Sequence, residues 1–236
     1  MAWLPDVSSL KRAPPKTTAY IELRKSQAKA QGKTLPVHWT WAGWNDISDD
    51  LKHAVLTAED DTFYRHNGVD WGAVKMAFDK DLSERRLAYG ASTITQQVAR
   101  NLYLSPSKNP LRKIKEVFIA YKLEKELGKR RIFELYLNIA EWGKGIFGAE
   151  AASQAYFGKH ASELTVDEAV ALAVVLPSPL RHDAGKGGPY VDRNSRRVMA
   201  RMRMSGYLPD EDEGEFEVYT STELAAPVVS TTTATP

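Results

Sequence analysis

Three consecutive acidic residues, Glu59, Asp60 and Asp61, begin the segment EDDTFYRHNGVD. Like charges packed together raise the pKa of at least one carboxyl group, which suits a general acid or base working near neutral pH. Glu59 also falls at the end of an apolar helical pattern, where the helix dipole disfavours a carboxylate. The simple alternative is a helix end exposed to water, but a locally costly arrangement without visible compensation points to function.

A second carboxylate, Glu116, lies above an apolar helical stripe, with Arg112 and Lys113 one turn before it. These cations would keep Glu116 ionised, and they could equally bind a phosphate group beside it. By spacing alone, an Arg–Glu pair on a helix surface is the more frequent explanation.

The polar segment GASTITQQVARN (residues 90–101) begins at a glycine and then enters a helix. Ser92 or Thr93 can cap that helix, and its free N–H groups favour an anion. Gln96 and Gln97 cannot both face the core, so at least one presents its amide to a cleft or to water. A capped amphipathic helix is the simpler explanation, but it leaves the two glutamines without a role.

Other candidate motifs are weak. His66 has no second His or Cys at ligand spacing, so we interpret it as a structural hydrogen-bonding residue, with metal ligation as the less favoured alternative. We predict no metal-binding residues. The segment SPSK (105–108) matches the Ser-x-x-Lys of penicillin-binding transpeptidases, but Ser-Asp-Asn and Lys-Thr-Gly are absent, which indicates a chance match. The sequence has no P-loop and no glycine-rich dinucleotide motif.

Composition favours an ordinary globular protein, with 236 residues of which 43% are hydrophobic and 26% charged. The net charge is only +2, but basic residues concentrate at 100–116 and 192–203, and acidic ones at 209–217. The first basic segment suggests an anionic ligand or membrane surface, whereas the second is typical of a solvated helix face. The absence of cysteine excludes disulfides and thiolate metal sites.

The elements that must position these residues are mainly helical. No apolar run reaches the ~20 residues of a membrane-spanning helix, and the N-terminus does not have the pattern of a signal peptide. The alternation in VHWTW indicates a short strand, and we expect at most a small β hairpin. Apolar residues at helical spacing and capping signals predict helices within 17–33, 48–60, 93–104, 109–129, 130–143, 146–159, 165–177 and 192–206.

Taken together, EDDTFYRHNGVD, GASTITQQVARN, RKIKE with AYKLEKELGK, and the segment 129–159 resemble the motifs of the family-51 glycosyltransferases in order and spacing. These enzymes polymerise peptidoglycan from lipid II. The similarity runs from about Trp39 to Gly206, and without a penicillin-binding module the chain resembles the monofunctional form. Two features depart from the family: an N-terminal transmembrane helix is absent, and Arg100 stands where many relatives have lysine.

The resemblance implies a mainly α, lysozyme-like domain with two lobes, called head and jaw. It places the glycosyltransferase domain at 39–208, after an N-terminal segment (1–38) that follows a removed membrane anchor, and before a disordered acidic and Ser/Thr-rich tail (209–236). It also implies the bacterial cytoplasmic (inner) membrane as location, with the catalytic domain on the outer, periplasmic face. Residues 71–89 would be the part that touches the membrane.

The resemblance also implies a mechanism in which Glu59 takes the proton of the acceptor 4-hydroxyl as that oxygen attacks the donor anomeric carbon. Inversion gives a β-1,4 bond and releases undecaprenyl pyrophosphate. Glu116 is the second catalytic residue, and Mg²⁺ or Mn²⁺ bridging to it is the expected cofactor. Asp60, Phe63 and His66 would shape the cleft. The substrate-binding residues would be Ser92, Gln96, Gln97, Arg100, Lys108, Arg112 and Lys113.

The implied partners are lipid II, the growing glycan strand and the membrane surface, with cell-wall synthesis proteins as further candidates and no nucleic acid. Two other functions stay open at this point. A lysozyme-like glycan-cleaving enzyme would use a cleft glutamate but would have no use for a series of cations, because its leaving group carries no phosphate. A non-catalytic scaffold that binds lipid II would have no need of both glutamates.

Overall fold

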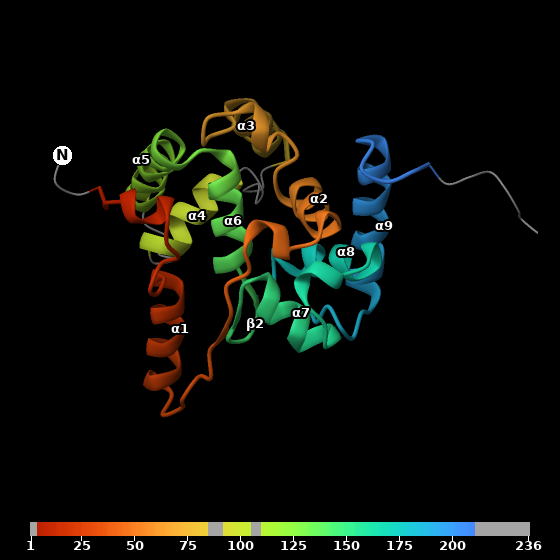
Figure 1. Cartoon of the computed structure of the whole chain (residues 1–236). Coiled ribbons are helices and arrows are strands. Elements are labelled where there is room, and N and C mark those ends of the chain that lie inside the picture. Colours follow the sequence, from red (N-terminus) through yellow and green to blue (C-terminus); the bar gives the residue numbers. More distant parts are fainter. Residues whose placement is uncertain (1–3, 85–91, 105–109, 211–236) are drawn as a thin grey trace, which may run out of the picture.

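The computed structural model describes residues 4–84, 92–104 and 110–210. The described part of the chain is mainly helical, as predicted, with one small sheet (Figure 1). The longer helices are α1 (Ala19–Ala30), α2 (Asp49–Glu59), α3 (Trp71–Glu84), α4 (Ile94–Tyr103), α5 (Pro110–Leu127), α6 (Lys129–Ile139), α7 (Ala149–Phe157), α8 (Val166–Val175) and α9 (Pro189–Met204). Short 3-10 turns are η1 (Ser8–Lys11), η2 (Trp44–Asp46), η3 (Phe63–Arg65) and η4 (Ala161–Glu163).

Local capping chemistry explains where several helices begin. The Ser48 hydroxyl accepts a hydrogen bond from the amide of Leu51 at the start of α2. Thr93, rather than Ser92, caps α4 and forms a capping box with Gln96. Gly128, between α5 and α6, has a φ of +75°, a conformation that suits glycine and lets the chain turn sharply between two helices.

The core divides the helices into two groups. The nearly all-apolar helix α8 packs between α2 and α9, while α4 packs against both α5 and α6 (Figure 1). These groups fit the predicted two-lobed, lysozyme-like, mainly α domain. Because α2 ends at Glu59 in one group and α4 carries Gln97 in the other, the two groups meet at the predicted base.

The sheet consists of a small hairpin and one further strand, and the hairpin occupies the end of segment 130–143 and the start of segment 146–159, where helices were expected. Strands β2 (Glu141–Gly143) and β3 (Ile146–Phe147) are antiparallel, and β1 (His38–Trp39), from the predicted VHWTW strand, pairs in parallel with β3. The buried side chain of Asn138 donates to the carbonyl of Ala42 and accepts from its amide, which fixes the chain after β1 against α6.

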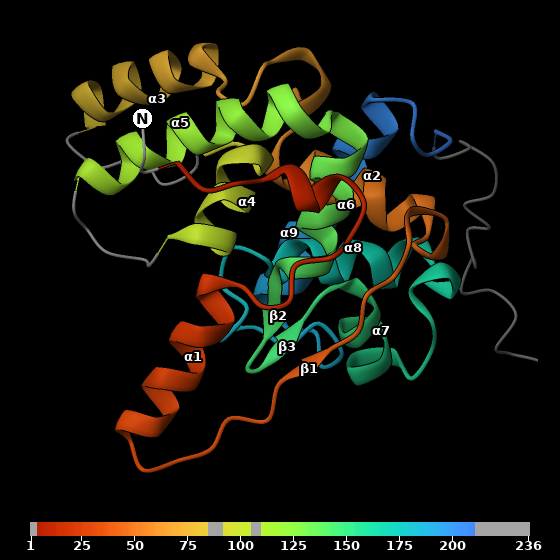
Figure 2. The ribbon, with the colours of Figure 1, turned by 60° about the vertical axis from the view of Figure 1, so that its left-hand side comes forward.

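Helix α3 lies beside α5 at the end of the molecule farthest from α1 and the hairpin (Figures 1 and 2). The indole of Trp71 donates to the hydroxyl of Tyr121, which joins the two helices. None of the helices in the described ranges is long and apolar enough to cross a membrane. The predicted domain limits stay predictions, and residues 211–236 of the predicted tail lie outside the described residues.

Candidate active site

Glu59 lies where two cavities meet. A cavity of about 430 Å³ and another of about 220 Å³ both include Glu59, Ala58 and Ser92 in their walls. The carboxylate is partly exposed to these cavities but mostly surrounded by protein, and this burial raises the pKa of Glu59 above its ordinary value. The negative charge of Asp60 is a smaller contribution in the same direction. The predicted rise therefore comes mainly from burial and only secondarily from crowded acids.

A short chain of hydrogen bonds orients the base. The amide nitrogen of Gln97 donates to Glu59 Oε2 at 2.7 Å, and the Tyr136 hydroxyl donates to the Gln97 oxygen at 3.3 Å. Burial raises the pKa of Tyr136 well above its ordinary value, so the phenol stays protonated and acts as a donor. The bond from Gln97, the charge of Arg100 and the Tyr136 hydroxyl each lower the pKa of Glu59 and limit the effect of burial.

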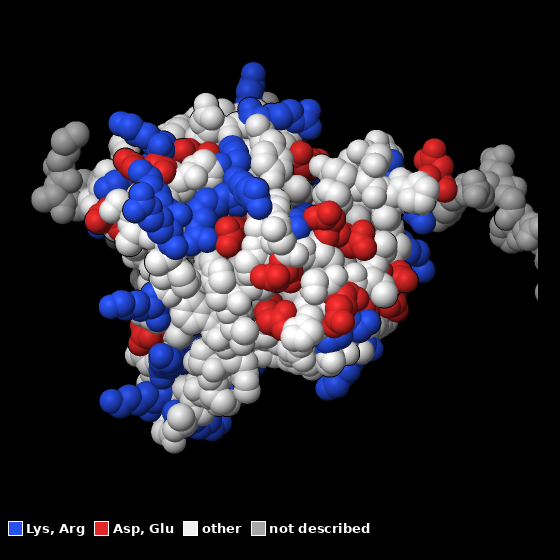
Figure 3. All heavy atoms as spheres, viewed as in Figure 1, with Lys and Arg blue, Asp and Glu red and all other residues white. Residues whose placement is uncertain are grey.

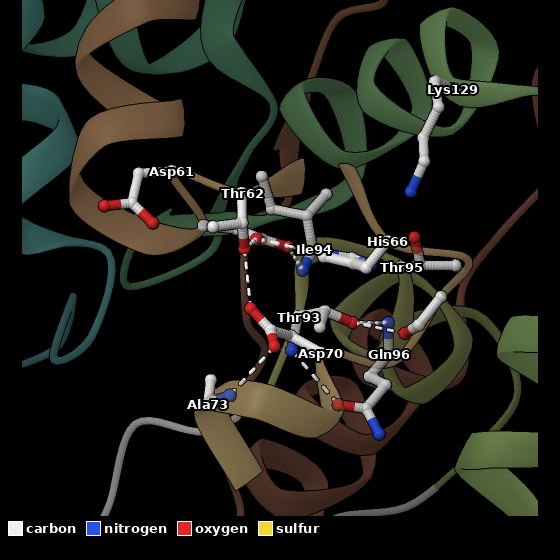
Figure 4. Close-up of polar contacts among 12 residues, drawn as sticks. Asp61, Thr62, His66, Asp70, Ala73, Thr93, Ile94, Thr95, Gln96 and Lys129 are labelled. Atoms are coloured by element: carbon white, nitrogen blue, oxygen red, sulfur yellow. Dashed lines mark hydrogen bonds and ion pairs between the residues drawn. The ribbon is translucent and has the colours of Figure 1, made fainter. Parts of the chain in front are cut away.

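Asp60, the residue after Glu59, connects the Glu59 turn to the start of helix α4 at Ile94, which Figure 4 labels. Its buried carboxylate accepts from the Ile94 amide at 2.9 Å and from His66 Nε2 at 3.0 Å. Thr62 donates to Asp70 at 2.7 Å, which closes the loop after the base upon itself. These contacts agree with the structural role predicted for His66, and through them Asp60 supports the turn that follows Glu59.

Gly68 completes this loop in a conformation that favours glycine, with φ +89°. A Cβ atom there would lie 3.2 Å from Glu124 Cγ and 3.4 Å from the Ala120 backbone, so a side chain would push the loop away from α5. The Thr93 hydroxyl donates to the Gly68 carbonyl at 2.6 Å. The loop after the base is therefore fixed to both α4 and α5.

Glu116 has the opposite surroundings. Its carboxylate is buried, with Arg112 Nη1 at 2.5 Å from one oxygen and Lys113 Nζ at 2.5 Å from the other. Lys113 also donates to the Ser92 hydroxyl at 2.8 Å, and Ser92 borders both cavities. The structure thus brings together four of the predicted site residues and attaches them to the cavities through Ser92.

Of the remaining predicted site residues, one lines the larger cavity, one does not reach it, and one lies outside the described residues. Arg100 lines the larger cavity, and its Nη2 donates to the Gln97 oxygen at 3.4 Å. Gln96 does not reach the cavities, because its side chain is 1% exposed and its oxygen accepts from the Thr93 amide in the capping box. The capping requirement of α4 therefore decides which glutamine faces the base, and the prediction of Gln96 as a substrate-binding residue is not supported by its position. Lys108 lies outside the described residues.

The donor set does not fit a divalent cation held at Glu116. Both carboxylate oxygens are engaged by cationic side chains, whereas Mg²⁺ prefers free carboxylate oxygens and water. Within 4–84, 92–104 and 110–210, no group of three or more His, Cys, Asp or Glu side chains could hold a metal ion. The expected Mg²⁺ or Mn²⁺ stays a prediction.

Tyr136, Arg24 and Glu141 line the larger cavity but are not among the residues predicted from the sequence. Tyr136 is part of a buried apolar helix pattern, which is typical of a core residue. Arg24 from α1 and Glu141 from β2 form an ion pair at 2.7 Å in the cavity wall, although 117 residues separate them in the chain. No local pattern connects two such distant residues, so the sequence offered no signal for the pair.

Comparisons with known proteins cover most of the chain. The sequence model of the family described as Transglycosylase matches residues 27–203. A biosynthetic peptidoglycan transglycosylase of Janthinobacterium sp. (strain Marseille) is 42% identical over 195 residues, covering 83% of this chain and 84% of that protein. A protein with the same name from Aromatoleum aromaticum is 45% identical over 188 residues, covering 80% and 81%. The resemblance to family-51 glycosyltransferases is thereby confirmed, and the chain belongs to the transglycosylase family.

Proposed function

We propose that this chain is a peptidoglycan glycosyltransferase that joins lipid II units into β-1,4-linked glycan strands and releases undecaprenyl pyrophosphate. The observation that carries this function is the position of Glu59, a carboxylate with a raised pKa at the junction of two cavities, beside the guanidinium of Arg100. The family and the names of its relatives support the same activity. They do not favour a glycan-cleaving enzyme or a non-catalytic scaffold.

Glu59 acts as the general base in this proposal. A sugar hydroxyl is a poor nucleophile unless a base takes its proton as it attacks, and burial keeps the Glu59 carboxylate more basic than an exposed one. Gln97 donates to one carboxylate oxygen, Oε2, and in this proposal Oε1 accepts the proton of the acceptor hydroxyl. The acceptor hydroxyl in one cavity can therefore approach the anomeric carbon of a donor in the other.

The leaving pyrophosphate needs stabilisation of its developing charge more than it needs a proton. Arg100 lines the larger cavity together with Glu59, and its charge lowers the pKa of Glu59. The Ser92–Lys113 pair borders the same cavity, and Glu116 positions both Lys113 and Arg112. Glu116 is therefore a positioning residue for cations, and it does not itself transfer a proton.

The test of this function is polymerisation of labelled lipid II in detergent by the parent chain and by Glu59→Gln. We expect lysozyme-sensitive polymer from the parent and none from the variant. Release of soluble fragments from purified cell wall, without lipid II consumption, would instead establish a cleaving enzyme. Binding of lipid II that persists without any polymer from the parent would establish a scaffold.

We also propose that α3 and α5 bring the site to a membrane surface. Exposed apolar side chains follow one face of α5, namely Leu111, Ile114, Phe118 and Tyr121, and those of Trp71 and Met76 on α3 are 61% and 69% exposed. Lys and Arg side chains gather over the α5–α6 side of the molecule (Figure 3). An apolar face flanked by cations suits the boundary between anionic headgroups and acyl chains.

Vesicle binding tests the membrane proposal separately from the chemistry. The double variant Ile114→Gln and Phe118→Gln should lower partition into vesicles with anionic lipids by about tenfold, since each loses burial of a large apolar side chain. The control Lys125→Gln changes an exposed residue of the same helix and should have a smaller effect. Equal partition of the double variant and the parent would contradict the proposal. Peptidoglycan synthesis associates the chain with the cell envelope, and the inner membrane and its outer face are part of this proposal.

A further inference from the structure

A third cavity adjoins the catalytic one. Its volume is about 280 Å³, and it lies between α1 and the β2–β3 hairpin. Arg24 and Glu141 belong to its wall and also to the wall of the 430 Å³ cavity that contains Glu59. The two cavities are therefore neighbours, separated by a single ion pair.

That ion pair is strongly held. Arg24 donates from Nε and Nη2 to the Glu141 carboxylate at 2.7–3.0 Å, and the Glu141 side chain is only 3% exposed. Gln27 accepts from Arg24 Nη1 at 3.1 Å, so the guanidinium is fixed from two sides. A fixed partition between two cavities gives an extended ligand a rigid surface to lie across.

The third cavity extends away from the proposed membrane face. Helix α1 and the hairpin lie at the end of the molecule opposite α3 and α5 in both ribbon views (Figures 1 and 2). Lipid-linked ends of the substrates must stay at the membrane, so the sugar end of a growing strand has to leave in the opposite direction. The path from Glu59 past Arg24 leads in that direction.

The side chains of the third cavity suit an amino-sugar polymer. Gln27 and Gln31 offer amides for hydroxyl and acetamido groups, and Leu35 and Leu180 offer apolar contacts for the faces of sugar rings. Lys144 adds a cation suited to the carboxylates of attached peptides. Arg24 lies before residue 27, where the match to the family begins, so this wall includes a residue from outside the matched range.

We propose that this cavity is a subsite for the growing glycan strand, distant from the reacting atoms, which holds the product between successive additions. The inference rests on the proposed glycosyltransferase activity. It predicts that blocking the cavity shortens the product strands without slowing a single coupling, because the strand dissociates more often between additions.

The test uses Ala28→Trp, which places an indole in the cavity, and the matched control Ala30→Trp on the exposed side of the same helix. Single coupling is measured with a donor whose own 4-hydroxyl is blocked and an acceptor that keeps its 4-hydroxyl but carries no pyrophosphate leaving group. Strand length is measured with labelled lipid II. We expect Ala28→Trp to couple once at the parent rate and to shorten the median strand by about twofold to tenfold, the factor by which dissociation accelerates. Ala30→Trp should resemble the parent in both assays.

Each outcome decides one question. A strand-length distribution unchanged by Ala28→Trp overturns the subsite, whereas absence of any coupling by the parent overturns the proposed function itself. Circular dichroism and thermal unfolding show whether Ala28→Trp folds. If it does not, the double variant Gln27→Ala and Gln31→Ala decides, because it adds no bulk: shorter strands support the subsite, and unchanged strands overturn it.

Discussion

Glu59 and Glu116 are both largely enclosed by protein, yet their neighbours differ completely. Glu59 is held by a neutral amide, and burial raises its pKa. Glu116 is held by two cations, one at each oxygen. A proton acceptor must be able to bind a proton in the pH range of the reaction, whereas a carboxylate that positions cations must stay ionised. The contrast supports the proposed roles, proton transfer for the first glutamate and electrostatic support for the second.

The largest effect should come from Glu59→Gln, which removes the base but keeps the shape of the side chain. General base catalysis contributes about 10²–10⁴ in rate, so we expect a loss of at least this order in kcat with lipid II still bound. The control is Asp49→Asn at the other end of α2, where the carboxylate is 81% exposed. If Glu59→Gln retained parent activity, the comparison between the two glutamates would lose its basis.

Glu116→Gln should have a smaller effect of a different kind. The variant leaves Arg112 and Lys113 without their common partner, and we expect a fall of about 10- to 100-fold in kcat/KM, because misplaced groups reduce rates by this order. The acid limb of the pH–rate profile should stay in place, since the base is unchanged. Glu126→Gln, on the same helix and in an exposed pair with Lys11, is the control. A displaced acid limb in Glu116→Gln would mean that Glu116 takes part in proton transfer and would contradict its proposed role.

The variant Gln97→Ala tests the role of Glu59 through the pH dependence of kcat/KM. The hydrogen bond from Gln97 lowers the pKa of Glu59, so its removal should raise that pKa further. A base must be ionised to act, and activity therefore rises as pH passes upward through this pKa. The acid limb of kcat/KM should move to higher pH in the variant, and high pH should recover part of the activity. An acid limb that moved to lower pH would contradict the described role of Gln97.

Tyr136→Phe should give the smallest change. It removes one hydroxyl that orients Gln97 and that also lowers the pKa of Glu59. A single hydrogen bond contributes about 0.5–1.5 kcal/mol, so we expect a fall in kcat of up to about tenfold and an acid limb displaced upward, as in Gln97→Ala. If the variant has a normal pH profile and only a lower thermal stability, Tyr136 acts as a core residue and does not orient Gln97.

Local chemistry explains why much of the fold could be predicted. The helical spacing of apolar residues and the caps at Ser48 and Thr93 depend on neighbouring residues, so the sequence was sufficient to predict α2, α4 and α8. The strand at VHWTW was correct in place. The hairpin was expected without a position, and its strands lie in segments for which helices were expected. The pairing of β1 with β3 joins segments far apart in the chain.

The parts of the site that depend on tertiary contacts could not be predicted in the same way. The choice between Gln96 and Gln97 depends on how the Thr93 capping box rotates α4. The sequence suggested crowded acids as the reason for a basic Glu59, but enclosure by the opposite group of helices is the larger cause. Arg24 and Glu141 meet only after α1 has packed beside the hairpin.

The position of Glu59 at the junction of two cavities has a kinetic consequence. Donor and acceptor can lie on opposite sides of one carboxylate at the same time. This geometry suits a single displacement through a ternary complex, in which both sugars are bound before either product leaves. Initial rates at varied donor and acceptor concentrations should then give intersecting double-reciprocal lines, whereas a covalent glycosyl-enzyme would give parallel ones.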